Sequence, residues 1–469
     1  MIAPVLLKTD MLFFVLLVAA ALYAWYAGRH EHLCAPWRQV ARQPLGMAAA
    51  VVLGAYLLIA FLDSLHFRVS PAASGQTSTN FSHDINSVFD VLVAPLRDGV
   101  ERTYSAPFAA EAYAKEIVEL ADGSNSRAYP RLEHGGAHLR DPASERGPDI
   151  AARLIGGILL GAALAVVIGA IAVTVCARTA RRPWSATAMA MLRGEAHVPW
   201  RTILGTVLTL ALLLGCAIEL APYYHVFGTD QVGNDVLYQA LKSIRTGLLI
   251  GTLTTLVMLP FAVVLGLVAG YFGGWVDDAI QYLYTTLSSI PGVLLVAASA
   301  LMLEVYMARH GDSYASLAAR ADLRLLALCL ILGVTAWTSL CRYLRGEALK
   351  LRAVDFIEAA RAFGVSNTKI LARHILPNIM HIVMISIVLD FSGLVLAEAV
   401  LTYIDIGVDP SMESWGNMIN GARLELAREP VVWWSLAAAF VLMFALVLAA
   451  NIFADAVRDA FDPRLRDME

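Results

Sequence analysis

The chain has 469 residues, of which 58% are hydrophobic and 16% are charged, with a formal net charge of −4 and a mean hydropathy of +0.63. Soluble proteins carry about 25% charged residues, so the composition excludes an ordinary soluble enzyme and predicts an integral membrane protein. Basic residues do not cluster with exposed aromatic residues, which excludes nucleic acid as a partner. The five scattered cysteines have neither metal-ligand spacing nor the pattern of a disulfide framework.

Nine apolar stretches approach the roughly 20 residues that a helix needs to cross a bilayer. They cover residues 10–27, 46–64, 153–176, 202–221, 246–270, 277–302, 322–341, 379–404 and 432–454. The sequence therefore predicts an all-α polytopic membrane protein. The first stretch is flanked by Lys8 and Asp10 and lacks a clear small-residue cleavage site, so we interpret it as a retained anchor rather than a signal peptide.

Basic residues concentrate on one side of the predicted membrane. With nine spans, the loops after the first, third and seventh helices and the C-terminal tail share that side. Because such residues gather in the cytoplasm, we expect the N-terminus outside and the C-terminus inside. One outer loop opposes the rule, since it carries Arg309, Arg320 and Arg324 beside several acidic residues.

The hydropathy pattern divides the chain into four parts. Residues 1–64 hold two accessory transmembrane helices, and residues 153–200 hold a third with a cytoplasmic loop. Between them, residues 65–152 form a hydrophilic extracytoplasmic insertion, in which residues 108–120 show a helix-like pattern. The insertion has too few apolar residues for a large core of its own, so we expect it to pack on the rest. Residues 201–469 carry the six remaining helices.

A turn-rich segment, FGTDQVGNDVL at residues 227–237, precedes the fifth apolar stretch. Its aspartates can cap helices and accept backbone hydrogen bonds. The segment is consistent with a turn that orders the following helix and equally with a docking surface.

Residues 355–377, DFIEAARAFGVSNTKILARHILP, form a polar stretch between two apolar segments. Asp355 suits a helix start, with Glu358 three residues later as in a capping box. Gly364 suits a left-handed stop just after that helix.

The second half of this stretch predicts another short helix. Ser366 or Asn367 can cap it, and Pro377 is expected to end it before the next apolar segment. The whole stretch thus predicts a helix–glycine–helix elbow at the membrane surface. An ordinary capped amphipathic helix in a loop is the alternative interpretation.

The elbow resembles the EAA loop of binding-protein-dependent ABC importer permeases. The family pattern of Glu-Ala-Ala, Gly and Leu-Pro is matched with every spacing kept. The matching residues are Glu358, Ala359, Ala360, Gly364, Leu376 and Pro377. The chain departs from the general pattern at His374, where Ile is frequent. His-Ile-Leu-Pro-Asn at residues 374–378 is similar to the dipeptide, oligopeptide and nickel branch.

The resemblance implies a type I ABC importer transmembrane domain, with about six core helices in residues 201–469 preceded by about three accessory helices. It implies a coupling loop at residues 343–378 in a bacterial inner membrane protein. It also implies three kinds of protein partner: a second homologous permease, two cytoplasmic ATP-binding subunits and an extracytoplasmic substrate-binding protein. The chain is expected to lie in the lipid bilayer. The expected ATPase-coupling residues are Asp355, Glu358, Ala359, Ala360, Gly364, His374, Leu376 and Pro377.

Two carboxylates in the eighth apolar stretch are candidates for a translocation path or gate. Asp390 lies near its middle, where an acidic residue is costly in a bilayer. It either lines the path or bonds to a neighbouring serine such as Ser386 or Ser392. Glu398 matches the family and is expected to order the gate region.

The resemblance also points to an outer surface that meets the binding protein. The candidate residues are Gly228, Thr229, Asp230, Asp235, Trp415, Gly416 and Asn417. Asn234 replaces an arginine that is usual in the family, which puts a charge contact there in doubt. A loop that folds back on itself explains Trp415 equally well.

The sequence holds no phosphate-binding loop, metalloprotease motif or nucleophile motif, so no catalytic residue, metal site or cofactor is predicted. We therefore expect a transport subunit rather than an enzyme, with short peptides as the substrate and nickel or another small solute as an alternative. An ion-gradient-driven transporter or channel that uses Asp390 and Glu398 is the other hypothesis. Such a protein often shows inverted repeats, and none is obvious here.

Overall fold

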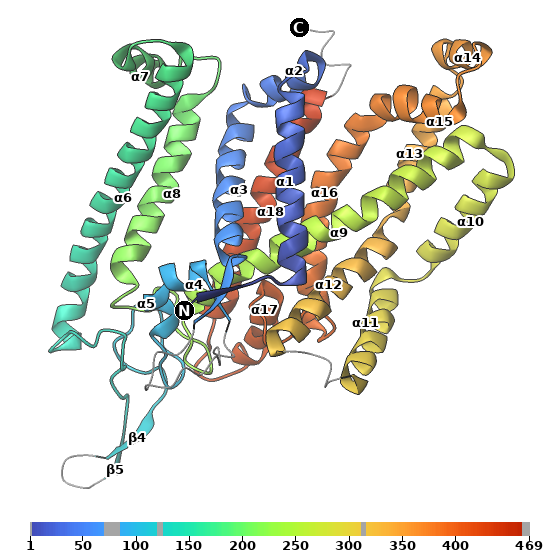
Figure 1. Cartoon of the computed structure of the whole chain (residues 1–469). Helices are drawn as coiled ribbons and strands as arrows, with labels where there is room; N and C mark the ends of the chain where they lie inside the picture. Colours follow the sequence, from blue (N-terminus) through green and yellow to red (C-terminus); the bar gives the residue numbers. More distant parts are fainter. Residues whose placement is uncertain (1, 70–84, 120–124, 311–315, 462–469) are drawn as a thin grey trace. The chain divides into compact units, whose positions relative to one another are not determined.

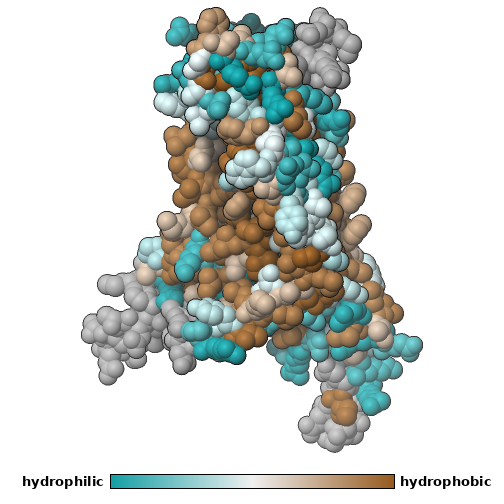
Figure 2. Space-filling view, turned by 90° about the vertical axis from the view of Figure 1, so that its right-hand side faces the viewer, coloured by the Kyte–Doolittle hydropathy of each residue, from teal (hydrophilic) through white to brown (hydrophobic). Residues whose placement is uncertain are grey.

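Long apolar helices dominate the computed structural model, which describes residues 2–69, 85–119, 125–310 and 316–461. Within these ranges, nine helical runs are long and apolar enough to cross a membrane, in agreement with the prediction. They are Lys8–Ala27, Pro44–Asp63, Pro142–Ala180, Trp200–Leu220, Val236–Phe272, Gly292–Arg309, Leu317–Leu351, Asn367–Tyr403 and Trp434–Phe461. On the face drawn in Figure 2, hydrophobic side chains form a broad band with hydrophilic ones beyond both of its edges.

One predicted span, residues 277–302, is wrong because the chain breaks inside it. The structure has two helices here, α10 (Gly274–Ser289) and α11 (Gly292–Arg309). Ile290, between them, is extended with φ −88° and ψ 129°. A residue that precedes proline is disfavoured in the helical region, so Pro291 forces the break.

The chain divides into two compact units. The first contains Met1–Val5, Arg38–Thr246 and Glu413–Ala449, and the second contains Leu6–Trp37, Gly247–Met412 and Ala450–Glu469. The helices α9 (Val236–Phe272) and α18 (Trp434–Phe461) contribute residues to both.

In the first unit, α6 (Pro142–Ala180) and α8 (Trp200–Leu220) run side by side (Figure 1). A Cβ built on Gly161 would lie 2.5 Å from the carbonyl oxygen of Ala211, and one on Gly215 would clash with the backbone of Gly157. Small residues at a helix contact let two membrane helices approach closely, so these glycines set the pairing. The remaining helices of this region are α3 (Pro44–Asp63), α4 (Val88–Leu92), α5 (Ala94–Asp98), α7 (Trp184–Arg193) and α17 (Trp415–Glu425).

The hydrophilic segment of the first unit contains short strands as well as helices. The strands β1 (Ile2–Val5), β2 (His66–Val69) and β3 (Asn86–Ser87) form one antiparallel sheet, and β4 (Glu116–Glu119) pairs with β5 (Asn125–Ala128) in another. The helix expected at residues 108–120 is wrong. Phe108 has a positive φ of 57°, and turns lead from it into β4.

Helix α6 begins within the segment predicted to be hydrophilic, where Asp141 caps its N-terminus and Pro142 stands in its first turn. Ala110 and Leu139 of the segment are buried against Leu220 and Tyr224 at the end of α8. The insertion therefore packs on the helices of its own unit.

The core of the second unit lies around α9, α13 (Thr338–Leu351) and α16 (Leu376–Tyr403). The unit also contains α1 (Lys8–Ala27), most of α2 (Glu31–Val40), α10, α11 and α12 (Leu317–Ala336). The N-terminus of α1 is fixed by Asp322 of α12. Its carboxylate accepts the backbone N–H of Lys8 at 2.9 Å and also the hydroxyl of Thr9. A carboxylate at this end of a helix is favourable for the helix dipole.

Candidate functional site

The elbow predicted at residues 355–377 is present in the second unit, as two helical arms around a glycine. The first arm, α14 (Asp355–Ala362), begins after Val354, which is its N-cap and makes no side-chain capping bond. The predicted capping by Asp355 is therefore wrong. Asp355 and Glu358 instead place two negative charges in the first turn, where the helix dipole favours them.

Gly364 ends the first arm in the left-handed conformation that the sequence predicts, with φ +75°. Its N–H donates to the carbonyl of Arg361 at 3.0 Å, and the N–H of Val365 donates to Ala360 at 3.1 Å. This pair of bonds is a Schellman motif, which satisfies the last carbonyls of the helix. The angle between the arms is thus set by the backbone.

The second arm begins at α15 (Asn367–Ile370), where Ser366 occupies the N-cap position but makes no side-chain capping bond. The expectation that Pro377 ends this arm is wrong, because the chain continues through a π-helical turn, η2 (Leu371–Ile375), into α16.

Hydrogen bonds around the π-helical turn explain how the helix accommodates Pro377, which lacks an N–H. The N–H of Leu376 donates to the carbonyl of Leu371, five residues earlier. The side-chain amide of Asn378 donates to the carbonyl of His374 at 2.7 Å. The elbow is therefore joined to a membrane-spanning helix by continuous helical structure.

The base of the elbow is anchored by three isoleucines. Ile357, Ile370 and Ile375 are completely buried in the core that also contains residues of α9 and α13. The hydroxyl of Tyr271, at the end of α9, donates to the Asn367 side chain at 2.8 Å. Both arms are thus attached to the same core.

The solvent-facing surface of the elbow carries exposed groups, among them Phe363 directly after α14. Phe363 is 88% exposed, although burying such a side chain is worth about 1.5–3 kcal/mol. Of the predicted coupling residues, Asp355, Glu358, Ala359, Gly364 and Pro377 are exposed, and Ala360, His374 and Leu376 are half-buried. Figure 1 shows α14 standing beyond α13 and α15.

A bidentate ion pair joins the neighbouring helices α10 and α13. Arg345 donates from Nε to one oxygen of Asp277 at 2.5 Å and from Nη2 to the other at 2.7 Å. Paired bonds of this kind fix geometry as well as contributing energy. The helix that precedes the elbow is therefore held in a defined orientation to α10.

The two predicted gate carboxylates both lie on α16 but are not brought together. Glu398 is buried and accepts a hydrogen bond from Thr402 at 2.8 Å. Asp390 is half-buried, and in the described part of the chain it has no hydrogen-bond partner. Ser392, one of its expected partners, donates to the carbonyl of Val388 instead. A role for either carboxylate in a path stays a prediction.

The residues predicted to meet a binding protein lie in the first unit and are largely buried. Gly228, Thr229 and Asp235 are buried and Asp230 is half-buried. The Thr229 hydroxyl accepts the N–H of Ser105 at 2.6 Å and donates to the carbonyl of Thr103. Insertion backbone therefore covers this segment.

The other predicted residues of that surface begin α17. Trp415 is 1% exposed and donates from Nε1 to the carbonyl of Ala240 at 3.0 Å. Gly416 is buried and Asn417 is half-buried, with its N–H donated to the Ser414 hydroxyl. Within this unit, the tryptophan ties α17 to the start of α9.

Sequence reasoning missed a buried charge cluster centred on His225. Its Nδ1 lies 2.7 Å from a carboxylate oxygen of Asp235, and its Nε2 lies 3.3 Å from one of Glu101. Burial alone would lower the pKa of His225, but the hydrogen bonds to Asp235 and Glu101 raise it to about 9. His225 is therefore a buried imidazolium that donates to both carboxylates.

Glu101 extends this cluster into the insertion, where it accepts backbone N–H groups of Glu133, His134 and Gly135 at 2.8–2.9 Å. Burial opposes its ionisation, but the bonds from His225 and these amides lower its pKa to about 2. Glu101 and His225 are 124 residues apart, so no local pattern in the sequence could have linked them.

A second missed contact joins the insertion to α9. Lys242 donates to Asp90 at 2.6 Å, and the hydroxyl of Tyr238 donates to the same oxygen at 2.8 Å. Burial would raise the pKa of Asp90, but Lys242 lowers it. An ionisable residue in a membrane helix is expected to be paired, and here the partner comes from the insertion.

Comparison with known proteins identifies relatives for the C-terminal half of the chain. Residues 262–467 match the model of the family described as binding-protein-dependent transport system inner membrane component. The oligopeptide transport system permease protein OppC of Mycobacterium tuberculosis is 32% identical over 244 residues, which cover 52% of this chain and 77% of that protein.

Two further relatives show similar identity. The dipeptide transport system permease protein DppC of Lactococcus lactis is 30% identical over 240 residues, 51% of this chain, and the chain spans 64% of its length. The glutathione transport system permease protein GsiD of Pectobacterium atrosepticum is 30% identical over 244 residues, 52% of this chain and 73% of that protein.

A solved structure of the MetNI methionine ABC transporter in inward-facing conformations is 17% identical. It covers 47% of this chain and 94% of its own, with a TM-score of 0.34. The sequence relatives, rather than this weak likeness, carry the assignment.

Proposed function

Since the chain belongs to the family of binding-protein-dependent transport system inner membrane components, we propose that it forms half of a substrate pathway in an ATP-driven importer. The family confirms the resemblance inferred from the elbow, and the nine apolar helices agree with a multi-pass inner membrane protein. A second, similar permease would supply the other half of the path. Two cytoplasmic ATPase subunits would each receive one elbow, and an extracytoplasmic protein would deliver the substrate.

The observation that carries this proposal is the elbow. Its outer face exposes Phe363 and Glu358, while Ile357 is fully buried beneath them. An exposed aromatic side chain on a firmly anchored helix suits contact with a partner. Because the second arm continues into α16, a force on α14 would be transmitted directly to a membrane-spanning helix.

The elbow would act by rigid-body movement. When the ATPase pair closes, the two elbows would approach each other and the path would open outward; hydrolysis would reverse the change. Such two-state movements of packed elements are a known basis of switching. In this scheme the chain itself performs no catalysis, and Gly364 fixes the angle at which α14 meets its partner.

We propose short peptides as the substrate, because the relatives named above are dipeptide, oligopeptide and glutathione permeases. Nickel or another small solute is the alternative.

The test is co-purification in mild detergent from the native membrane, followed by reconstitution of what is recovered. We expect a second permease and an ATPase at fixed stoichiometry, and ATP-dependent uptake of a labelled dipeptide by the reconstituted complex. Nickel uptake without dipeptide uptake would contradict the peptide assignment. Recovery of the chain alone, with flux driven by an ion gradient, would contradict the ATP-driven mechanism and favour the path through Asp390 and Glu398.

A further inference from the structure

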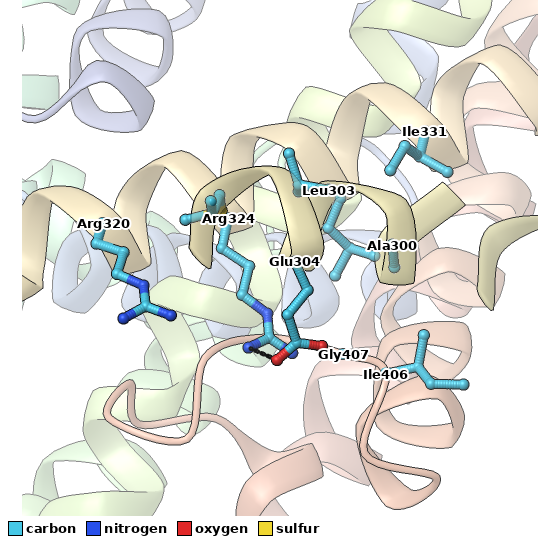
Figure 3. A pocket seen from close by; sticks show the side chains of 10 residues that line it. Ala300, Leu303, Glu304, Arg320, Arg324, Ile331, Ile406 and Gly407 are labelled. Atoms are coloured by element: carbon cyan, nitrogen blue, oxygen red, sulfur yellow. Dashed lines mark ion pairs between the residues drawn. The ribbon is translucent and has the colours of Figure 1, made fainter. Parts of the chain in front are cut away.

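Two arginines of α12 line a small hollow in the second unit (Figure 3). Arg320 and Arg324 are four residues apart, so they lie on one face of the helix. The opposite walls are mostly apolar and come from α11 and from the loop after α16. They include Ala300, Leu303, Glu304, Ile406 and Gly407.

The guanidinium groups in this hollow have N–H donors that are not satisfied by hydrogen bonds. The Arg320 side chain makes no hydrogen bond or ion pair with the described residues, and its Nε is buried without a partner. Arg324, whose side chain is 16% exposed, lies 3.8 Å from Glu304 and 3.9 Å from Asp409. Charge-assisted hydrogen bonds are about 2.7–2.9 Å long, so neither contact satisfies its donors. Buried donors without partners are rare in proteins and call for an explanation.

Asp322, on the same helix, is already engaged, because it accepts the backbone N–H of Lys8 at the start of α1. The arginines also lie in the segment that opposes the positive-inside rule on the predicted outer side. Both facts indicate that the positive charge at this place has a function of its own.

We propose that the hollow binds a carboxylate group. Two planar guanidinium groups match the geometry of a carboxylate, and the small hollow admits one such group rather than a whole solute. The apolar wall formed by Leu303 and Ile406 suits the carbon atom that carries the ligand carboxylate. Resting on the proposed function, the carboxylate is the C-terminus of a transported peptide near the outer mouth of the path.

In this proposal, the Glu304 carboxylate competes with the ligand carboxylate for Arg324. Its side chain is 50% exposed, so it can turn toward water when another carboxylate approaches Arg324. Asp409, whose side chain is 17% exposed, stays in place. Removing the charge of Glu304 should therefore strengthen anion binding, whereas removing the charge of Arg320 or Arg324 should weaken it.

The experiment uses the full chain in lipid nanodiscs, with Ile406→Cys as a reporter and the native cysteines replaced. The measured quantity is the ratio of its modification rates by an anionic and a cationic methanethiosulfonate reagent. We expect the ratio to fall at least about fivefold in Arg320→Gln and Arg324→Gln, given the strength of a nearby charge. It should rise in Glu304→Gln and stay unchanged in Arg309→Gln, whose arginine is exposed on α11 outside the hollow.

These ratios report the charge at the hollow, which the substitutions alter whether or not an anion binds there. Protection of the reporter cysteine by a ligand therefore decides between a binding site and a purely structural ion pair. A ratio insensitive to both arginines, or no protection by Ala-Ala in the wild-type background, would overturn the proposal.

Protection of the reporter cysteine from modification distinguishes a peptide C-terminus from a small free anion as the source of the carboxylate. Ala-Ala should slow modification by the anionic reagent, and Ala-Ala amide should not. Equal protection by acetate and Ala-Ala would overturn the peptide assignment and leave a site for small anions. The measurement needs neither ATPase nor transport, so protection without ATP-driven uptake would contradict the proposed function and not this site.

Discussion

Gly364 has a φ of +75°, and a Cβ built on it meets no atom within 4 Å. Glycine is therefore needed here for its backbone torsion angle, and not because a side chain would collide with a neighbour. An L-residue pays about 1–2 kcal/mol in this conformation, β-branched residues are the least tolerated, and asparagine is among the best tolerated. The elbow angle thus depends on one backbone position.

Replacing Gly364 by valine should leave membrane insertion intact and reduce ATP-driven dipeptide uptake at least about tenfold, because the turn between the arms must change. Gly364→Asn should keep most of the activity. Gly346→Val on α13 is the matched control, since Gly346 has no positive φ and a Cβ built on it also meets no atom within 4 Å. Uptake assays on the reconstituted complex check this, and normal uptake by Gly364→Val would disprove the elbow's role.

His225 shows how a single buried charge can hold two distant segments together. Its side chain is 6% exposed and that of Glu101 is 2% exposed, so both charges depend on each other and on Asp235. Breaking a buried ion pair by removing one partner typically costs about 3–5 kcal/mol.

The pH dependence of unfolding should report this cluster. Because the pKa of His225 rises to about 9 on folding, its stabilisation is complete below the unfolded value of 6.5 and is lost as the pH rises through 9. The melting temperature of the purified chain should therefore fall as the pH rises from 6.5 to 9. His225→Gln should melt about 10 °C lower at pH 6 and lack this fall.

His134→Gln is the control for this experiment, since that side chain is exposed and only its backbone contacts Glu101. If the wild type and His225→Gln lose stability in parallel between pH 6.5 and 9, the cluster does not stabilise the fold.

At the scale of elements, α6 and α8 are matched by small residues along their contact. Gly157, Gly161 and Gly215 each face the backbone of the opposite helix. Membrane helices lack a hydrophobic drive to associate within lipid, so close packing of this kind contributes the attraction. The pair therefore depends on the absence of side chains at these positions.

Gly215→Leu should separate α6 from α8 and destabilise the first unit by about 1–3 kcal/mol, as overpacking does. Gly205→Leu on the same helix should be neutral, because a Cβ at Gly205 has no atom within 4 Å. Thermal unfolding in detergent compares the two variants. Equal melting temperatures would show that the helices pair by another contact.

At the scale of the whole molecule, the insertion is part of the structure of the first unit and not an appended loop. Gly228 and Gly233 have positive φ, and a Cβ on either would collide with backbone of Ser105 or Glu101. Tyr113 packs edge-on against Trp434, which donates to the carbonyl of Thr229 at 2.9 Å. The insertion, the segment after α8 and the start of α18 are interlocked.

Deleting residues 86–141 should therefore prevent the chain from accumulating in folded form, since it would uncover His225, Asp235 and Thr229. Deleting residues 116–128, which hold the β4–β5 hairpin, should be tolerated because those contacts lie outside it. Size-exclusion profiles and melting curves check both deletions. A stable, monodisperse product of the larger deletion would show that the insertion is dispensable for the fold.

The amino-acid sequence is sufficient to predict the membrane class, the number of apolar helices and the position of the elbow. Each follows from composition, hydropathy or a local rule such as the preference of Gly364 for positive φ. Sequence patterns also give two wrong predictions. Pro377 is expected to end a helix but lies inside a continuous one, because a π-helical turn accommodates it. Hydropathy predicts one span where Pro291 breaks the chain into two helices.

Contacts between residues far apart in the sequence depend on tertiary packing. The pairing of His225 with Glu101, of Lys242 with Asp90, and of α1 with Asp322 joins segments that no periodicity relates. The hollow lined by Arg320 and Arg324 likewise forms only when α11, α12 and the loop after α16 come together. Hydropathy indicates whether a segment is more stable in lipid or in water, whereas the partner of a buried charge depends on how the whole chain packs.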